Sequence, residues 1–256
     1  KDHDASVSLL WKNAARMLTY GYGGWWFDMW GGWFSDPEML QVLEKTQQFH
    51  QDYPSENPEK MKPSVLVIVD EELSFWDKSY GRLAEKILSN RYPIAKTGSA
   101  YDLYLRTDLQ EIAHSQYQVI WLMGLLHLTD KETALIKRWQ KMGKTVMWTS
   151  NKGTKLNYPE KAAEFLPGKL QWKPSELKKI WTEAGVHQYI SSEDICYVGR
   201  NWLSIHSVDG GEKNIQLPYF AQVIDPITNK VLSDSTNQIQ IKMDAKSTVI
   251  FRVNPF

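Results

Sequence analysis

Tryptophan is concentrated near the start of this chain. The sequence contains 12 tryptophans, and residues 23–33 read GGWWFDMWGGW. Aromatic rings can stack on the C–H faces of sugars, so this density points toward carbohydrate. The alternative is that the rings only fill a core or an interface, which is the common use of tryptophan. Residues 23–33 are therefore a candidate for contact with carbohydrate.

Residues 23–30 are expected to form a buried strand, because glycine bounds a run that is too short and too aromatic for a helix. Alternating side chains point to opposite faces of a strand. Trp25, Phe27 and Met29 would then share one wholly apolar face, and we expect that face to pack under a layer of helices.

The opposite face of this strand combines indole rings with a carboxylate, which is unusual for a plain core. At the end of a (β/α)-barrel strand, such a face would line the mouth of an active site. We therefore expect a sugar-contacting role for four residues: Trp26, Asp28, Trp30 and Trp33. A glycosidase needs two carboxylates, and this face carries only one, so no catalytic residue is assigned. The alternative is again that the aromatics only fill space.

A second set of polar residues follows the apolar segment 65–69. Asp70 and Glu71 come directly after it, and open α/β sheets bind ligands just outside the carboxyl ends of their strands. A small-ligand site formed by Asp70, Glu71, Ser74 and Asn151 is one interpretation. The alternative is that these acidic residues are solvated or cap the next helix.

Other signals argue against several classes of function. No G-x-G-x-x-G, P-loop or G-x-S-x-G pattern is present, and the six histidines are scattered, so we expect no cofactor and no metal. The single cysteine, Cys196, excludes a disulfide framework and is expected to be a buried thiol. The 30 basic and 30 acidic residues balance, which gives no case for nucleic acid. No apolar run is long enough for a membrane span.

The periodicity predicts an α/β fold in three parts. Helices are expected over 6–20 and from Asp36, as N-cap, to about residue 50, followed by a polar linker, 51–63. Alternating strands and helices then predict a flavodoxin-like parallel sheet. Its expected strands are 65–69, 102–105, 119–123 and 145–149, with a short one near 187–190. Its expected helices are 80–88, 129–143 and 174–184, and Thr129 with Glu132 forms a capping box.

From about residue 194 the pattern changes to short segments with period-two alternation. These are 202–207, 214–217, 221–224, 238–243 and 247–253, and turn sequences separate them. They predict a small all-β module, most simply a sandwich. The expected domains are therefore 1–60, 61–192 and 193–256.

Three stretches resemble the glycoside hydrolase family 42 β-galactosidases. Residues 23–33 with Asp36-Pro37 look like the eighth strand of the catalytic barrel and the start of its helix. Residues 69–71, 101–105 and 143–148 are similar to the trimerisation domain, a degenerate class I glutamine amidotransferase-like fold. Residues 184–187, 205–207 and 217–218 are similar to the C-terminal β domain. In that family both catalytic glutamates would lie upstream of Lys1.

The resemblance implies the non-catalytic C-terminal portion of a glycoside hydrolase, inactive as an isolated chain and cut from a longer gene product. It also implies a homo-oligomer, with a trimer as the model, and a carbohydrate partner in the intact enzyme. A secreted or periplasmic setting would suit polysaccharide breakdown. The alternative is a stand-alone carbohydrate-binding or scaffolding protein.

Overall fold

The computed structural model describes residues 3–27, 31–32, 35–53, 58–76, 82–125, 128–149 and 170–256. The chain divides into two compact units. The first unit comprises Lys1–Lys62, Ala95–Ala100 and Gln188–Phe256, and the second comprises Pro63–Ile94 and Tyr101–His187. The boundaries expected from the sequence separate residues 1–60 from residues 193–256, whereas the structure places both segments in one unit.

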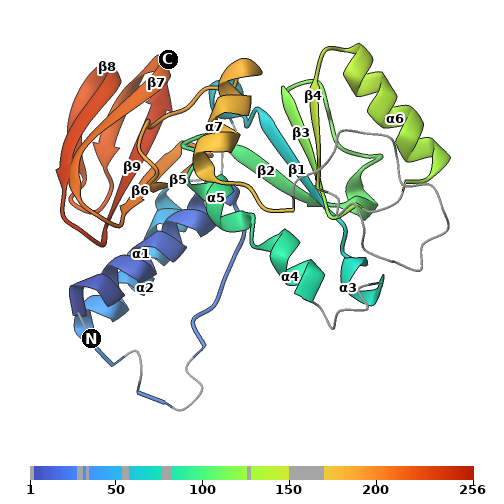
Figure 1. The fold of residues 1–256 in the computed structure, drawn as a ribbon. Helices are drawn as coiled ribbons and strands as arrows, with labels where there is room; N and C mark the ends of the chain where they lie inside the picture. The colour runs from blue at the N-terminus through green and yellow to red at the C-terminus, as the bar shows by residue number, and fades with distance from the viewer. Residues whose placement is uncertain are drawn as a thin grey trace. The chain divides into compact units, whose positions relative to one another are not determined.

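A sheet of four parallel strands forms the centre of the second unit (Figure 1). The strands are β1 (Val65–Val69), β2 (Tyr101–Leu105), β3 (Val119–Met123) and β4 (Thr145–Thr149), in the order β2-β1-β3-β4. Every residue of β1 and β3 is buried, as their continuous apolar sequences predict for strands covered on both faces. The four strands predicted between residues 65 and 149 are thus confirmed.

Helices supply side chains to both faces of this sheet. On one face α6 (Asp130–Lys141) buries Trp139 in an apolar core with strand residues. On the other face Trp121 of β3 makes an edge-to-face contact with Trp181 of α7 (Pro174–Glu183), with ring centroids 6.4 Å apart. The shorter helices among the described residues are η1 (Glu59–Met61), α3 (Leu73–Trp76), α4 (Arg82–Leu88), α5 (Arg91–Ala95) and η2 (Arg106–Asp108).

The strand predicted near residues 187–190 does not extend the parallel sheet. Ile190 instead forms an isolated antiparallel bridge with Ile215, and the backbone N–H of Tyr189 donates to the carbonyl of Gly98 at 2.6 Å. Tyr189 and Ile190 therefore form their backbone hydrogen bonds with residues of the first unit. The helical spacing over 129–143 also predicts that Met142 is buried, but Met142 is the C-cap of α6 and is 56% exposed.

An antiparallel sheet of five strands dominates the first unit. The strands are β5 (Ile195–Gly199), β6 (Trp202–Ser207), β7 (Gly211–Asp225), β8 (Lys230–Met243) and β9 (Ser247–Pro255). Their order is β5-β6-β9-β7-β8. The alternation of buried and exposed residues in β7 matches the predicted period of two.

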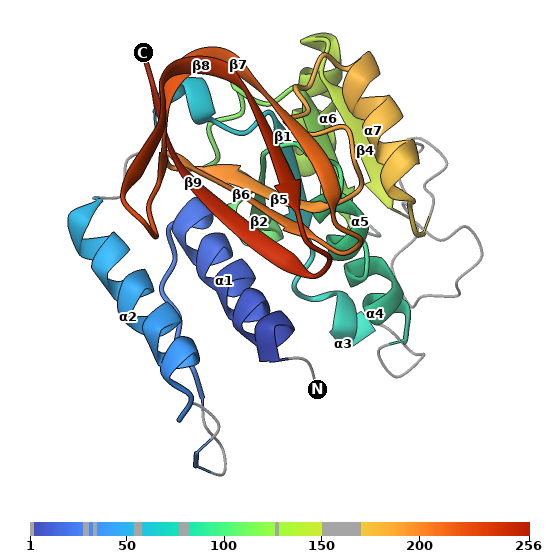
Figure 2. The same ribbon diagram turned by 90° about the vertical axis from the view of Figure 1, so that its left-hand side faces the viewer.

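The sandwich expected here is wrong in form, because the described strands of this unit belong to one sheet. The predicted segments 214–217 and 221–224 join into the single strand β7, whose register with β8 shifts between Gln216 and Ile224. Bulges of this kind bend a strand, and Figure 2 shows β7 and β8 curving along their length. A bent sheet can enclose an apolar core by itself, whereas a sandwich needs two sheets to do so. Cys196 is buried in this core, as predicted.

Two helices pack together in the same unit, α1 (His3–Tyr20) and α2 (Pro37–Asp52) (Figure 1). Phe49 of α2 packs with Trp202 of β6, with ring centroids 5.7 Å apart. The N-cap prediction is confirmed, since Asp36 accepts hydrogen bonds from the backbone N–H groups of residues 38 and 39 at 3.0 and 3.1 Å. No helix in the described part of the chain is long and apolar enough to cross a membrane.

The strand predicted over residues 23–30 does not form in its described part, residues 23–27. The expected faces are also reversed, because Trp25 is 77% exposed and Phe27 is 67% exposed, whereas Trp26 is half-buried. A strand needs hydrogen-bonded neighbours, and neither sheet includes this segment among its paired strands. Gly24 instead lies against α1, where an added Cβ would be 2.3 Å from the sulfur of Met17.

Candidate functional site

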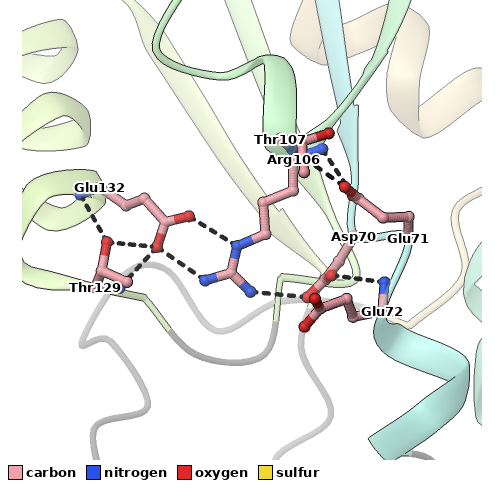
Figure 3. Close-up of polar contacts among 7 residues, drawn as sticks. All are labelled: Asp70, Glu71, Glu72, Arg106, Thr107, Thr129 and Glu132. Atoms are coloured by element: carbon pink, nitrogen blue, oxygen red, sulfur yellow. Dashed lines mark hydrogen bonds and ion pairs between the residues drawn. The ribbon is translucent and has the colours of Figure 1, made fainter.

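The carboxyl ends of the parallel strands bring together charged residues from distant parts of the second unit (Figure 3). Asp70 follows β1 directly and Arg106 follows β2 directly, and the two strands are paired in register from Val65 with Tyr101 onward. Glu132 comes from the first turn of α6. Because neighbouring parallel strands end at the same edge of a sheet, these side chains can meet there.

Arg106 binds two carboxylates at once. Its Nε and Nη2 donate to Oε1 and Oε2 of Glu132 at 2.7 and 2.8 Å, and its Nη1 donates to Oδ2 of Asp70 at 3.0 Å. The Asp70 side chain is fully buried, and those of Arg106 and Glu132 are only 13% and 10% exposed. A two-point arginine–carboxylate contact of this kind fixes both groups in orientation.

Glu132 also completes the capping box predicted from the sequence. Its Oε2 accepts from the backbone N–H of Thr129 at 2.7 Å and from the Thr129 hydroxyl at 2.8 Å. The Thr129 hydroxyl in turn accepts from the backbone N–H of Glu132 at 3.2 Å. The same carboxylate therefore caps α6 and holds Arg106 in place.

Glu71 occupies a backbone anion site at the start of η2. Its Oε2 accepts from the backbone N–H of Arg106 at 3.0 Å, and its Oε1 accepts from that of Thr107 at 3.3 Å. On the other side, Oδ1 of Asp70 accepts from the backbone N–H of Glu72 at 3.0 Å. All six carboxylate oxygens of Asp70, Glu71 and Glu132 thus accept a hydrogen bond from the protein itself.

These contacts shift the acidities of the groups in different directions. Burial opposes the charge of Arg106, but hydrogen bonds and charges from Glu132 and Asp70 outweigh it and raise the pKa of the guanidinium. Burial likewise opposes ionisation of Glu132, yet its bonds to Arg106 and Thr129 lower its pKa overall. For Asp70, burial outweighs the attraction of Arg106, and its pKa is raised.

Open α/β sheets bind ligands in the crevice at the strand ends where the strand order reverses, here between β1 and β3, and Leu73 of α3 lies beside these ends. The Leu73 side chain is 1% exposed, and a Cβ on Gly124 would lie 2.9 Å from its Cδ2. The backbone N–H of Asp70 donates to the carbonyl of Met123 across the same crevice at 3.3 Å. Among the described residues, the carboxylates at this edge are therefore engaged by protein groups, and Leu73 packs close to Gly124.

The structure describes only some of the other residues predicted to form the two sites. Ser74 lies in α3, and Asn151 lies outside the described residues. Trp26 packs against an apolar cluster of α1 and α2 that includes Leu10 and Val42. Asp28, Trp30 and Trp33 lie outside the described residues.

Arg106 was missed in the sequence, although its position was a usable signal. It directly follows a predicted strand, in the same way that Asp70 follows another. Among the described residues, no group of three or more His, Cys, Asp or Glu side chains is arranged to hold a metal ion.

A second buried ion pair lies in the first unit. Nζ of Lys213 is 2.7 Å from Oδ2 of Asp194, and both side chains are less than a tenth exposed. The hydroxyls of Ser192 and Ser207 donate to the same carboxylate at 2.7 and 2.9 Å. Burial opposes ionisation of Asp194, but these partners outweigh it and lower its pKa. The pair ties the segment before β5 to β7.

Comparison with known proteins finds similarity in structure only. No family model matches the chain, and no curated protein matches it in sequence. Similar solved structures include a β-galactosidase from Bacillus circulans sp. alkalophilus, with a TM-score of 0.53 and 13% identity over 84% of this chain and 44% of that one. They also include an exo-carrageenase GH42 from Bacteroides ovatus, with a TM-score of 0.46 and 12% identity over 86% of this chain and 33% of that one. The chain spans less than half the length of either protein. At this identity the β-galactosidase likeness shows the fold alone: the chain is folded like one part of a glycoside hydrolase.

Proposed function

We propose that this chain is the non-catalytic C-terminal portion of a glycoside hydrolase that acts in carbohydrate breakdown. The observation that carries the proposal is the shared fold with a β-galactosidase, which extends over 84% of this chain and 44% of that protein. In this reading α1, the segment after it and α2 are the end of a catalytic barrel. The parallel sheet serves oligomerisation, with a trimer as the model, and the catalytic carboxylates belong to an upstream part of the enzyme.

The strand order supports a flavodoxin-like sheet of the degenerate amidotransferase type. The order β2-β1-β3-β4 corresponds to the first four strands of the flavodoxin-like order, 2-1-3-4-5. The polar network at the strand ends supports a structural role, because the carboxylates of Asp70, Glu71 and Glu132 already accept hydrogen bonds from Arg106 and from backbone N–H groups.

The tryptophan-rich segment would complete the sugar cleft of the intact enzyme. Trp26 anchors that segment to α1 and α2. From this anchor the chain continues into Asp28, Trp30 and Trp33, the other residues proposed to line the cleft. The proposal assigns them contact with sugar and gives none of them a catalytic role.

The alternative function is that of a stand-alone carbohydrate-binding or scaffolding protein. One observation favours it: Trp25 and Phe27 are 77% and 67% exposed, with ring centroids 6.5 Å apart. Exposed aromatic rings offer flat apolar surface to a sugar. In the fragment reading, the upstream barrel would instead cover these rings.

The intact mass of the native subunit separates the two functions. The chain described above has a mass of 29.7 kDa. We expect the native subunit to be heavier by at least a whole barrel, about 250 residues. We also expect the isolated chain to leave aryl glycosides uncleaved while the native protein hydrolyses them. A native subunit of 29.7 kDa, or hydrolysis by the isolated chain at enzymatic rates, would reject the proposal.

A further inference from the structure

The outer face of the bent antiparallel sheet carries a regular arrangement of uncharged groups. Along β7 the side chains of Ala221 and Val223 are buried in the core of the first unit. Successive side chains of a strand point to opposite faces. The alternate residues Gln216, Phe220 and Gln222 therefore belong to the outer face of β7, the strand whose curvature Figure 2 shows.

Two phenylalanines lie side by side at the centre of this face. Phe220 is 58% exposed and Phe256 is 64% exposed. The backbone N–H of Phe256 donates to the carbonyl of Phe220 at 3.2 Å, so the two residues are neighbours across β7 and the end of β9. Directly opposite residues on adjacent strands have Cβ atoms about 4.5–5.5 Å apart, so the two phenyl groups present one exposed apolar patch, here called the platform.

Amide side chains flank this platform in both directions along β7. On one side Gln222 is paired in register with Asn254, and Nδ2 of Asn254 is 3.4 Å from Oε1 of Gln222. On the other side Gln216 is paired in register with Gln238. Nε2 of Gln216 donates to the carbonyls of Leu217 and Asn237, which orients that amide.

We propose that this face, formed by Gln216, Phe220, Gln222, Gln238, Asn254 and Phe256, binds a neutral polysaccharide chain. Apolar platforms flanked by a few oriented polar groups are typical of ligand sites. Amides suit vicinal hydroxyls because each offers donors and an acceptor without charge.

The six side chains of the face are uncharged, and the charges near it lie at its ends or are covered: Arg252, on the same face of β9, is 5% exposed and lies over the ring of Tyr53. Glu212 and Lys242 oppose each other in register at one end, and Asp234 lies at the other end, beside Gln222 at 3.5 Å. The choice of carbohydrate among neutral ligands rests on the proposed function. The residues involved are different from those of the proposed sugar cleft.

The test is affinity electrophoresis of the full chain in gels that contain galactan or xyloglucan. We expect at least one of these polysaccharides to retard the wild-type chain. The double variant F220A/F256A should bind about tenfold more weakly, because it loses the burial of two phenyl rings. Gln222→Ala should weaken binding by a smaller factor. Phe75→Ala is the matched control, because Phe75 is 85% exposed and belongs to the other unit.

Three outcomes would overturn the proposal. They are equal retardation of wild type and F220A/F256A, no retardation of the wild type in either gel, and a wild-type dimer in sedimentation that F220A/F256A dissociates. The last would assign the face to a second copy of the chain. Each of them leaves the mass of the native subunit unchanged, so failure here is distinguishable from failure of the proposed function.

Discussion

Arg106 and Glu132 face each other through two parallel hydrogen bonds, 2.7 Å from Nε to Oε1 and 2.8 Å from Nη2 to Oε2. The contact joins the end of β2 to the first turn of α6, and Nη1 of Arg106 extends it to Asp70 at the end of β1. The guanidinium of Arg106 therefore links β1, β2 and α6, three elements that are far apart in the sequence.

Arg106→Leu should destabilise the second unit strongly, because it leaves two buried carboxylates without their cation. Breaking one partner of a buried ion pair costs about 3–5 kcal/mol. Arg106→Lys should lose less, since it keeps the charge but not the two-point geometry. Urea unfolding followed by circular dichroism measures the free energy of unfolding.

Arg91→Leu is the control for Arg106→Leu. Arg91 is exposed and lies in the short helix α5, so its replacement should change stability by less than about 0.5 kcal/mol. Equal effects of the two substitutions would mean that the Arg106 network contributes no more than a surface contact.

Glu132→Gln should show at which pH the ionised carboxylate of Glu132 stabilises the fold. The pKa of folded Glu132 lies below its ordinary value of 4.5, so its charge stabilises the fold above that value. This contribution should fade as the pH falls through the folded pKa. Glutamine can still serve the capping box through its amide oxygen, but its NH2 group cannot accept from Nε of Arg106, so the change removes the charge together with one of the two bonds to Arg106.

The measurement is the difference in unfolding free energy between wild type and Glu132→Gln. Near neutral pH we expect the wild type to be more stable by about 1.5–3 kcal/mol, the usual size of a hydrogen bond to a charged group. At about pH 3 the gap should narrow. The comparison largely cancels other carboxylates, including Asp70, whose pKa shift has the opposite sign. A gap that is the same at both pH values would contradict the assignment.

Local signals predicted much of the parallel-sheet unit. The apolar runs 65–69 and 119–123 are buried strands, because a strand covered on both faces needs apolar side chains at every position. The pair Thr129 and Glu132 predicted the start of α6, because the hydrogen bonds of a capping box form within one helical turn. Such features depend on neighbours in sequence, so the sequence alone specifies them.

Features that depend on distant partners were harder to predict. The tryptophan run was expected to be a strand, but a strand requires a neighbour that no local pattern supplies, and Trp25 is exposed. The Asp70 site was predicted without Arg106, which lies 36 positions further on. Both residues directly follow predicted strands, but which strands become neighbours in a sheet depends on pairing between distant segments. The sandwich prediction failed in the same way, since bulges in β7 bend one sheet where two were expected.

Lys213→Met should destabilise the first unit, because it leaves buried Asp194 with only two hydroxyl partners. We expect a loss of about 3–5 kcal/mol, as for other buried pairs that lose one member. Asp194→Asn combined with Lys213→Met should recover part of this loss, because it removes the stranded charge. The free energy of unfolding in urea is again the measurement.

Lys242→Met is the matched control for Lys213→Met. Lys242 lies on the neighbouring strand β8 but is exposed, so its replacement should cost less than about 0.5 kcal/mol. If Lys213→Met behaves like Lys242→Met, the Asp194–Lys213 pair is not important for stability.

Gly98→Ala should be more destabilising than Gly211→Ala, although both glycines have positive φ and lie in the first unit. Their φ values are +73° and +93°, a region that costs other residues about 1–2 kcal/mol. A Cβ on Gly98 would also lie 2.5 Å from the backbone carbonyl oxygen of Ile190, whereas one on Gly211 would meet nothing within 4 Å.

The backbone of Ile190 cannot move away easily, because the adjacent Tyr189 N–H is bonded to the carbonyl of Gly98 itself. Gly98→Ala should therefore lose about 1–3 kcal/mol more than Gly211→Ala, the usual cost of overpacking. Thermal and urea unfolding of the two variants measure this difference directly. If the two variants are equally stable, the conformational cost of positive φ accounts for both, and the close approach of Gly98 to Ile190 adds nothing.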